Sequence, residues 1–318
     1  MNRRIVAAAL VCLFALALAG AGPAAAQDSG EKKFEVTLLG TGTPFPSINR
    51  FGPAILVRAG GKYLLFDCGR GVTQRLFQIK LPFGKIDHLF LTHLHSDHVV
   101  GIPDLWLLGW LGAPWARRRA PFAVTGPEGT ANMMANLEKA YAWDIETRLT
   151  DQKLPPLGVQ VAATDMSEGM VYDSDGVKVT AFKVNHGKLI DPAYGYRIEF
   201  DGRTVVLSGD TKYNENLVRH AEGADLIVHS VAAIAAGLLE KSKVMRAILG
   251  HHSEPEDTAK VFNTVKPKLA VYSHLVLYGG TTTEDLLRRA RADYSGEVRV
   301  GEDLMVIDVG RDKVTVRN

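Results

Sequence analysis

The sequence predicts an α/β protein in which two β-sheets pack face to face with helices on both outer sides, a four-layer αββα sandwich. Runs with strand-like alternation and segments with helical spacing follow one another throughout residues 34–318. In both halves of the chain, polar residues that can bind metals follow apolar runs. No linker separates the halves, and 318 residues that are 46% hydrophobic suffice for one large core. We therefore predict a single domain over residues 34–318.

The first 33 residues have a different composition. The basic segment Asn2-Arg3-Arg4 precedes an apolar run over residues 5–19, and small residues occupy positions 23–26. This pattern predicts a signal peptide over residues 1–26, cleaved after Ala26, and a disordered mature N-terminus over residues 27–33. The run is short for a membrane span. We therefore expect a secreted or periplasmic protein that has no membrane association after signal cleavage.

The sequence of the first half of the domain predicts a strand-rich block and helices. Alternating or continuous apolar runs predict strands over residues 34–39, 54–58, 62–66, 88–91 and 122–125. Helical spacing predicts helices over residues 72–79, 102–111 and 129–142. Residues 147–160 are polar and contain prolines, and we expect a loop there.

The second half repeats this organisation. Strands are predicted over residues 177–184, 194–200, 204–207, 225–228 and 268–273, with a terminal hairpin over residues 298–309. Helices are predicted over residues 215–221, 254–266 and 284–292. Ser253 and Glu256 have the spacing of a capping box at the start of the second of these helices.

The segment from Thr92 to His98 carries the most specific signal. It contains His93, His95, Asp97 and His98 directly after the predicted strand over residues 88–91. Alternate side chains of an extended segment share a face, so the first two histidines point the same way. The chain then turns, and the last two side chains can aim at a second point nearby. Imidazole nitrogen and carboxylate oxygen suit zinc and similar metals. The segment predicts a metal site.

Three further candidate ligands, His186, Asp210 and His274, each directly follow an apolar strand. Ligands at strand ends on one rim of a sandwich can converge from distant positions in the chain. Taken singly, each of the three would be an ordinary histidine or turn residue. Their shared position predicts that they join the same site.

Several motifs carry a family resemblance. They are Leu38-Leu39-Gly40-Thr41-Gly42-Thr43-Pro44, Phe66-Asp67-Cys68-Gly69, the His-x-His-x-Asp-His run, Tyr194-Gly195-Tyr196-Arg197, Ser208-Gly209-Asp210-Thr211, His252-Ser253 and Ser273-His274. With them the chain resembles the metallo-β-lactamase superfamily, in its ribonuclease Z and arylsulfatase-like branch. The resemblance implies a single metallo-β-lactamase-fold hydrolase domain over residues 34–318, two Zn²⁺ ions as cofactors, and a homodimer as one possible assembly.

The resemblance also implies a division of the ligands. His93, His95 and His186 would hold one zinc ion, whereas Asp97, His98 and His274 would hold the other, and Asp210 would bridge them. Two metals stabilise the developing charge and lower the pKa of a bound water from about 15.7 towards about 7, so that hydroxide attacks the substrate.

Two residues are predicted to be catalytic. Asp97 would take or orient the proton of the attacking water. His252 would protonate the leaving group or hold the anionic centre, although the adjacent His251 competes for this role. Asp67 is a candidate for orienting a metal ligand, and a turn aspartate is the alternative.

Trp106 and Trp110, followed by Arg117, are candidates for binding an anionic or aromatic substrate. The alternative is an amphipathic helix with a solvated basic end.

The sequence favours a small ester, a sulfate or a phosphodiester, as the substrate of an exported zinc hydrolase. Trimming of tRNA 3′ ends, the best-known activity of the branch, is disfavoured because the chain carries a predicted signal peptide. The segment over residues 198–207 is a plain hairpin where short members carry a substrate-gripping arm, and residues 275–280 depart from the family's Ser-x-Arg-Tyr pattern.

A net charge of +2 also gives no strong field for nucleic acid, so we expect no nucleic-acid partner. A β-lactamase or lactonase is the first alternative. A tRNA 3′-processing endoribonuclease comes next, and a catalytically idle binding protein comes last.

Overall fold

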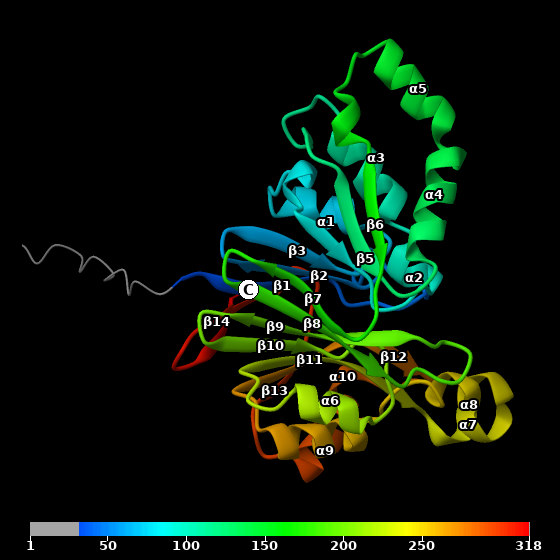
Figure 1. The fold of residues 1–318 in the computed structure, drawn as a ribbon. Coiled ribbons are helices and arrows are strands. Elements are labelled where there is room, and N and C mark those ends of the chain that lie inside the picture. Colours follow the sequence, from blue (N-terminus) through cyan, green and yellow to red (C-terminus); the bar gives the residue numbers. More distant parts are fainter. Residues whose placement is uncertain (1–31, 318) are drawn as a thin grey trace, which may run out of the picture. The chain divides into compact units, whose positions relative to one another are not determined.

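A computed structural model describes residues 32–317, and the predicted signal peptide lies outside these residues (Figure 1). Fifteen strands form two sheets. The strand order is β15-β14-β1-β2-β3-β4-β5-β6 in the eight-stranded sheet and β13-β12-β11-β10-β9-β8-β7 in the seven-stranded sheet. Helices cover the outer faces of both sheets (Figure 1). The predicted αββα sandwich is confirmed. Export of the chain stays a prediction.

The eight-stranded sheet draws most of its strands from the first half of the chain. It consists of β1 (Phe34–Gly40), β2 (Ala54–Ala59), β3 (Lys62–Phe66), β4 (His88–Phe90), β5 (Phe122–Gly126), β6 (Val161–Asp165), β14 (Val306–Val309) and β15 (Val314–Arg317). The helices of this half are α1 (Val72–Gln78), η1 (Phe83–Lys85), α2 (Ser96–Val99), α3 (Ile102–Trp110), α4 (Thr130–Ala140), α5 (Ala142–Thr150) and η2 (Pro156–Gly158).

The seven-stranded sheet comes entirely from the second half. It consists of β7 (Gly169–Ser174), β8 (Val177–Val184), β9 (Ala193–Phe200), β10 (Arg203–Leu207), β11 (Leu226–Ile234), β12 (Leu269–Tyr278) and β13 (Val298–Val300). Its helices are α6 (Glu215–His220), α7 (Ala236–Lys241), α8 (Lys243–Leu249), α9 (Pro255–Val265) and α10 (Thr283–Asp293).

Three apolar clusters hold the layers together. The central one fills the space between the sheets and includes Phe66, Phe90 and Tyr196, whose rings contact one another. A second cluster lies between the eight-stranded sheet and α1 and α3, and a third lies between the seven-stranded sheet and α6, α9 and α10. No helix within residues 32–317 combines the length and apolarity that a membrane crossing needs.

Three local predictions are wrong. The terminal segment is not one hairpin, because β13 pairs with β12 in one sheet whereas β14 pairs with β1 and β15 in the other. The segment expected to be a loop after residue 147 continues the helix α5 to Thr150. Ser253 does not cap α9, because its hydroxyl donates to the carbonyl oxygen of Thr211, and Glu254 is the N-cap residue.

Candidate metal centre

The loop between β4 and α2 carries His93 and His95, and the short helix α2 carries Asp97 and His98. His95 is the N-cap residue of α2. The amide of Cys68, after β3, donates to the carbonyl oxygen of His98 at 2.7 Å. Gly69 permits this close approach, since a Cβ at that position would lie 2.6 Å from the carbonyl oxygen of Asp97. The loop therefore presents its side chains from a backbone that the neighbouring strand end holds in place.

Three histidines converge on one point. Nε2 of His93 lies 2.9 Å from Nδ1 of His95, and Nε2 of His186 lies 3.3 Å from the same atom. Nδ1 of His186 donates to the carbonyl oxygen of His251 at 2.9 Å, which leaves a lone pair on Nε2. The sequence predicted these three residues as one ligand group, and the structure brings them together.

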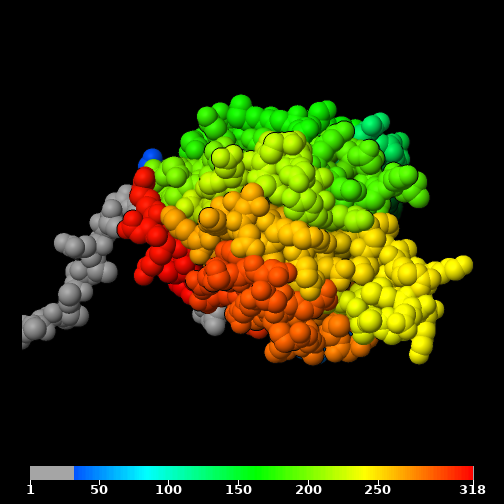
Figure 2. All heavy atoms as spheres, turned by 90° about the horizontal axis from the view of Figure 1, so that it is seen from below, coloured from blue at the N-terminus to red at the C-terminus, as the bar shows by residue number. Residues whose placement is uncertain are grey.

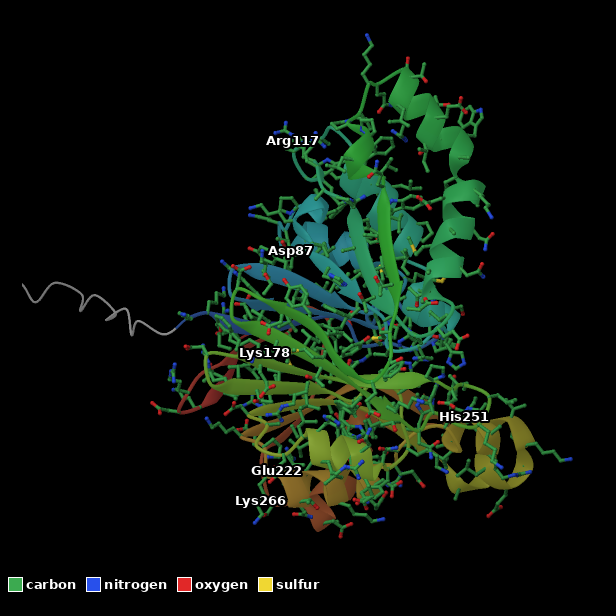
Figure 3. All side chains as sticks on the ribbon, in the orientation of Figure 1. Asp87, Arg117, Lys178, Glu222, His251 and Lys266 are labelled. Carbon is green, nitrogen blue, oxygen red and sulfur yellow. The ribbon has the colours of Figure 1, made fainter. Side chains whose placement is uncertain are left out.

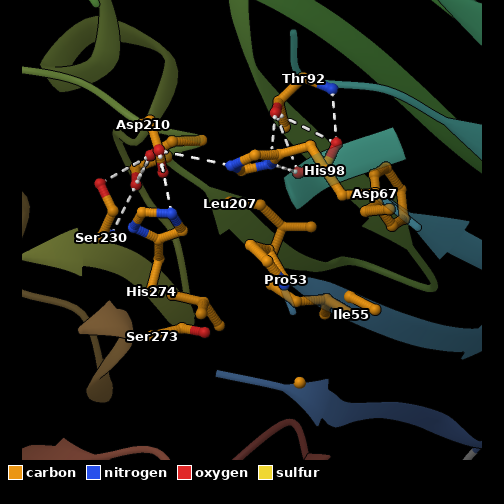
Figure 4. Close-up of a pocket in the computed structure, with 16 residues that line it drawn as sticks. Pro53, Ile55, Asp67, Thr92, His98, Leu207, Asp210, Ser230, Ser273 and His274 are labelled. Atoms are coloured by element: carbon orange, nitrogen blue, oxygen red, sulfur yellow. Dashed lines mark hydrogen bonds and ion pairs between the residues drawn. The ribbon is translucent and has the colours of Figure 1, made fainter. Parts of the chain in front are cut away.

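A second group forms beside the first. Nε2 of His274 lies 3.3 Å from Oδ2 of Asp97, and Nε2 of His98 lies 3.6 Å from the same oxygen. Oδ2 of Asp210 is 3.2 Å from His274 Nε2, 3.4 Å from His98 Nε2 and 3.9 Å from His186 Nε2. The carboxylate of Asp210 thus lies between the two groups, and Figure 4 shows it between the rings of His98 and His274.

The strands of the seven-stranded sheet deliver the remaining ligands. His186 and Asp210 follow the ends of β8 and β10. Gly209 has a φ of +60°, and a Cβ there would lie 2.4 Å from the carbonyl oxygen of Tyr194, so this turn requires glycine. His274 does not end its strand as predicted. It is the extra residue of a bulge in β12, with a φ of +47°, and the bulge turns its side chain to the rim.

Asp67 orients one ligand directly. Its Oδ2 accepts a hydrogen bond from Nδ1 of His98 at 2.8 Å, and its Oδ1 accepts from the amide of Thr92 at 2.8 Å (Figure 4). Because Nδ1 of His98 donates, its Nε2 keeps a lone pair for a metal. The sequence did not single out Thr92, whose hydroxyl lies 3.0 Å from Nδ1 of His93. Its place directly before the His-x-His pair was the available signal.

The electrostatics favour the protonation states that bind a cation. Burial lowers the pKa of His93 far below its usual value and the pKa of His252 to about 3. Burial acts to raise the pKa of Asp210, but the interaction with His274 and its neighbours outweighs it, and this pKa lies well below its usual range. His98 differs. Burial acts to lower its pKa, but the carboxylates that face it outweigh burial and raise it.

The residues present fit a dinuclear metal centre. Among the described residues, His98 Nε2 and His274 Nδ1 are buried without a hydrogen-bond partner. Neutral imidazoles with nitrogen atoms 2.9 and 3.3 Å apart place lone pairs against one another, which is stable only with a proton or a cation between them. Five imidazoles and two carboxylates are a donor set suited to zinc.

A cavity of about 160 Å³ opens over these groups, and both His251 and His252 line it. His252 is buried, its ring centroid lies 5.5 Å from that of His274, and its ring forms a potential ligand group with His186 and Asp210. His251 is half-buried and lies at the rim. The sequence did not decide which of these two histidines faces the site, and the structure places His252 deeper in it.

The three predicted substrate-binding residues lie away from this cavity. The indoles of Trp106 and Trp110 are fully buried in the core between α3 and the sheet, and each donates its Nε1 hydrogen to a backbone carbonyl group. Arg117 lies far from His251, in the upper part of the view in Figure 3. The tryptophans are core residues because the apolar face of α3 turns towards the sheet.

Comparison with known proteins identifies the family. A model described as the Beta-lactamase superfamily domain matches residues 62–275. Ribonuclease Z of Mycobacterium bovis (strain BCG / Pasteur 1173P2) is 35% identical over 279 residues, which cover 86% of this chain and 98% of that protein. The chain belongs to the metallo-β-lactamase superfamily, in its ribonuclease Z branch. It is a hydrolase of that superfamily.

Other proteins of the superfamily are also similar to this chain in sequence or in fold. Ribonuclease Z of Mycolicibacterium gilvum (strain PYR-GCK) is 36% identical over 281 residues, which cover 86% of this chain and 96% of that protein. The structure of human tRNase Z, short form, matches with a TM-score of 0.62 and 25% identity over 87% of this chain and 99% of that one. The metallo-β-lactamase fold protein YhfI of Bacillus subtilis has a TM-score of 0.68 at 20% identity, over 87% of this chain and 99% of that one, which concerns the fold alone.

Two expectations from the sequence are wrong. The relatives that are about 35% identical over most of this chain are named Ribonuclease Z, which contradicts both the small-ester hydrolase and the absence of a nucleic-acid partner. The argument from a missing arm fails, because an alignment that covers 98% of the M. bovis relative in 279 residues leaves no room there for a large extra segment. The argument from a net charge of +2 fails because a sum over the chain does not describe the surface beside the site.

Proposed function

We propose that this protein is an endoribonuclease that hydrolyses a phosphodiester bond at the 3′ end of precursor tRNA. The observation that carries the proposal is the match to proteins named Ribonuclease Z over 86% of this chain at 35% identity. The 25% identity to the short form of human tRNase Z supports the same substrate. A phosphodiester suits a site whose imidazoles and carboxylates can hold metal ions, because bound cations would attract its negative charge.

The proposed cofactor is a pair of zinc ions. His93, His95 and His186 would hold one ion, Asp97, His98 and His274 would hold the other, and Asp210 would contact both. The distances within each group support this division. When bound, such a pair makes hydroxide available at neutral pH and neutralises charge on the phosphoryl group.

The remaining chemistry belongs to side chains of this protein. The oxygen of a water molecule bonds to phosphorus and gives up one proton to Asp97 or to solvent. The bond from phosphorus to one ribose oxygen breaks, and that oxygen receives a proton from solvent. Asp97 accepts a hydrogen bond from the attacking water and fixes its direction. His252, which burial keeps neutral, donates one N–H hydrogen bond to a non-bridging phosphoryl oxygen.

The cavity suits an unpaired RNA end. Pro44 lines it, and the next residue, Phe45, has 67% of its surface exposed. Unpaired bases stack on exposed aromatic rings of this kind, whereas bases within a helix cannot. A cavity of about 160 Å³ also admits a single phosphodiester group but no folded nucleic acid.

A cleavage assay with three proteins tests the proposal. The zinc-loaded protein should cut a precursor tRNA that has a 3′ extension and leave mature tRNA intact. The Asp210→Ala variant should lose activity, since it removes the carboxylate between the two groups. The Asp87→Ala variant, changed at a surface residue distant from the site, should retain it (Figure 3). Wild-type protein that leaves the precursor intact while hydrolysing bis(p-nitrophenyl) phosphate would contradict the RNA substrate.

A further inference from the structure

A helical hairpin projects beside the cavity with no evident role in the core. It consists of α7 and α8, joined at Ser242, and neither helix contains a buried residue. Figure 2 shows this yellow segment at the edge of the molecule, with long side chains extending into solvent. Helices are normally stabilised by burying an apolar face. Leu238, Met245 and Ile248 are only half-buried, and a hairpin that buries so little apolar surface is better explained by a surface that it presents.

The base of the hairpin belongs to the wall of the cavity. It leaves the sheet at the end of β11 and returns at His251, and Ile248 and His251 both line the cavity. The amide of Ala235 donates to the carbonyl oxygen of Tyr278 at 3.1 Å, and Tyr278 also lines the cavity. These contacts fix the hairpin in position relative to the candidate metal ligands.

The hairpin is also stiff in itself. The Ser242 hydroxyl accepts a hydrogen bond from the amide of Met245 at 3.3 Å and so caps α8. The guanidinium of Arg246 donates to the carbonyl oxygens of Leu239 and Glu240, which close α7. The two helices are therefore linked at their junction, and charges on them have defined positions.

The charge of the hairpin is positive. The hairpin contains three basic residues, Lys241, Lys243 and Arg246, and one acidic residue, Glu240. Both lysines are exposed, and within residues 32–317 neither forms an ion pair. Their ammonium groups are available to a partner. Clustered lysines at the edge of a cleft attract phosphates, and such contacts position a nucleic acid without reading its sequence.

We propose that the α7–α8 hairpin grips the RNA backbone next to the scissile bond, with Lys241 and Lys243 as its phosphate contacts. This inference rests on the proposed ribonuclease function and adds to it the surface that holds the substrate. The β9–β10 connection is a tight turn at Asp201 and Gly202 and offers no comparable projection. The hairpin therefore supplies a gripping surface at a different place in the chain.

The test compares two double charge reversals. In Lys241→Glu/Lys243→Glu, kcat/KM for precursor tRNA at low salt should fall at least about tenfold. The slope of log kcat/KM against log salt should become shallower by about 1.4, since each single-strand phosphate contact contributes about 0.7. Lys178→Glu/Lys266→Glu makes the same charge change far from His251 and should behave as wild type (Figure 3). Hydrolysis of bis(p-nitrophenyl) phosphate should be unchanged in both variants.

The outcomes separate the two proposals. Equal RNA kinetics and salt slopes in the two variants, with wild-type protein active on the RNA, would overturn the role of the hairpin and leave the proposed function intact. A loss on both RNA and the small diester would also overturn it, because the defect would then lie in the catalytic centre. Wild-type protein that hydrolyses only the small diester would overturn the proposed function and this inference together.

Discussion

Replacing Asp67 by asparagine should weaken zinc binding without disturbing the fold. Asp67 has a φ of +59°, a conformation that asparagine also tolerates, so the backbone can stay in place. The amide oxygen of asparagine can still accept the hydrogen bond from the Thr92 amide, which is 2.8 Å long in the wild type. The variant therefore changes the partner of His98 and one acceptor of the Thr92 hydroxyl, which lies 2.9 Å from Oδ2 of Asp67 in the wild type.

The consequence follows from the proton on His98. In the wild type, Nδ1 of His98 donates to Oδ2 of Asp67 at 2.8 Å, and Nε2 faces Asp210 at 3.4 Å. The amide nitrogen of asparagine would occupy the position of Oδ2 and donate in the opposite direction. Nδ1 must then accept, and the proton moves to Nε2, the atom that would bind the metal. Loss of such a partner typically lowers metal affinity about 10–100-fold, or about 1.4–2.7 kcal/mol.

The assay is a zinc titration against a chromophoric chelator, with Asp87→Asn as the matched control. Asp87 likewise accepts a backbone hydrogen bond, from Tyr63 at 2.8 Å, but lies on the surface. We expect one weakened zinc site in Asp67→Asn, two wild-type sites in the control, and equal thermal unfolding of both after metal removal. Wild-type affinity at both sites in Asp67→Asn would refute the proposed orientation of His98.

Two further predictions concern stability. Burial lowers the pKa of His88 to about 4 in the folded protein, below its unfolded value near 6.5. Its contribution to stability is complete above pH 6.5 and is lost as the pH falls towards 4. Urea unfolding across this range should show on the order of 3 kcal/mol less pH dependence in His88→Gln. Trp110→Ala should lower the free energy of unfolding by about 3–5 kcal/mol, because it empties a buried position. Its folded fraction should keep wild-type KM, whereas a raised KM would restore Trp110 as a substrate contact.

Most of the candidate metal ligands were predictable from sequence because they occupy positions with a local signal. His186 and Asp210 directly follow apolar runs, and the sandwich brings such strand ends to one rim. His274 was identified for a partly different reason, since β12 continues past it and a bulge turns it outward. A bulge depends on the pairing of two strands and leaves no local mark in the sequence.

The failures share a physical cause, which is dependence on distant partners. Helical spacing predicted α3 correctly, but the direction in which Trp106 and Trp110 face depends on the sheet that α3 covers. The prediction of a terminal hairpin was wrong because β13 and β14 pair with strands of different sheets. The prediction of the substrate was wrong because net charge is a sum over the whole chain and does not describe the surface beside the cavity.

The seven candidate ligands come from both sheets of the sandwich. Residues 93–98 follow β4 of the eight-stranded sheet, whereas His186, Asp210 and His274 belong to strands of the seven-stranded sheet. An ion held by ligands from both sheets would tie the two layers together at their rim, and its binding energy would become part of the folding energy. At a free concentration about 100 times its Kd, one such ion adds about 2.7 kcal/mol to stability. The free zinc concentration would then set the fraction of the protein that is folded, as well as its rate of hydrolysis.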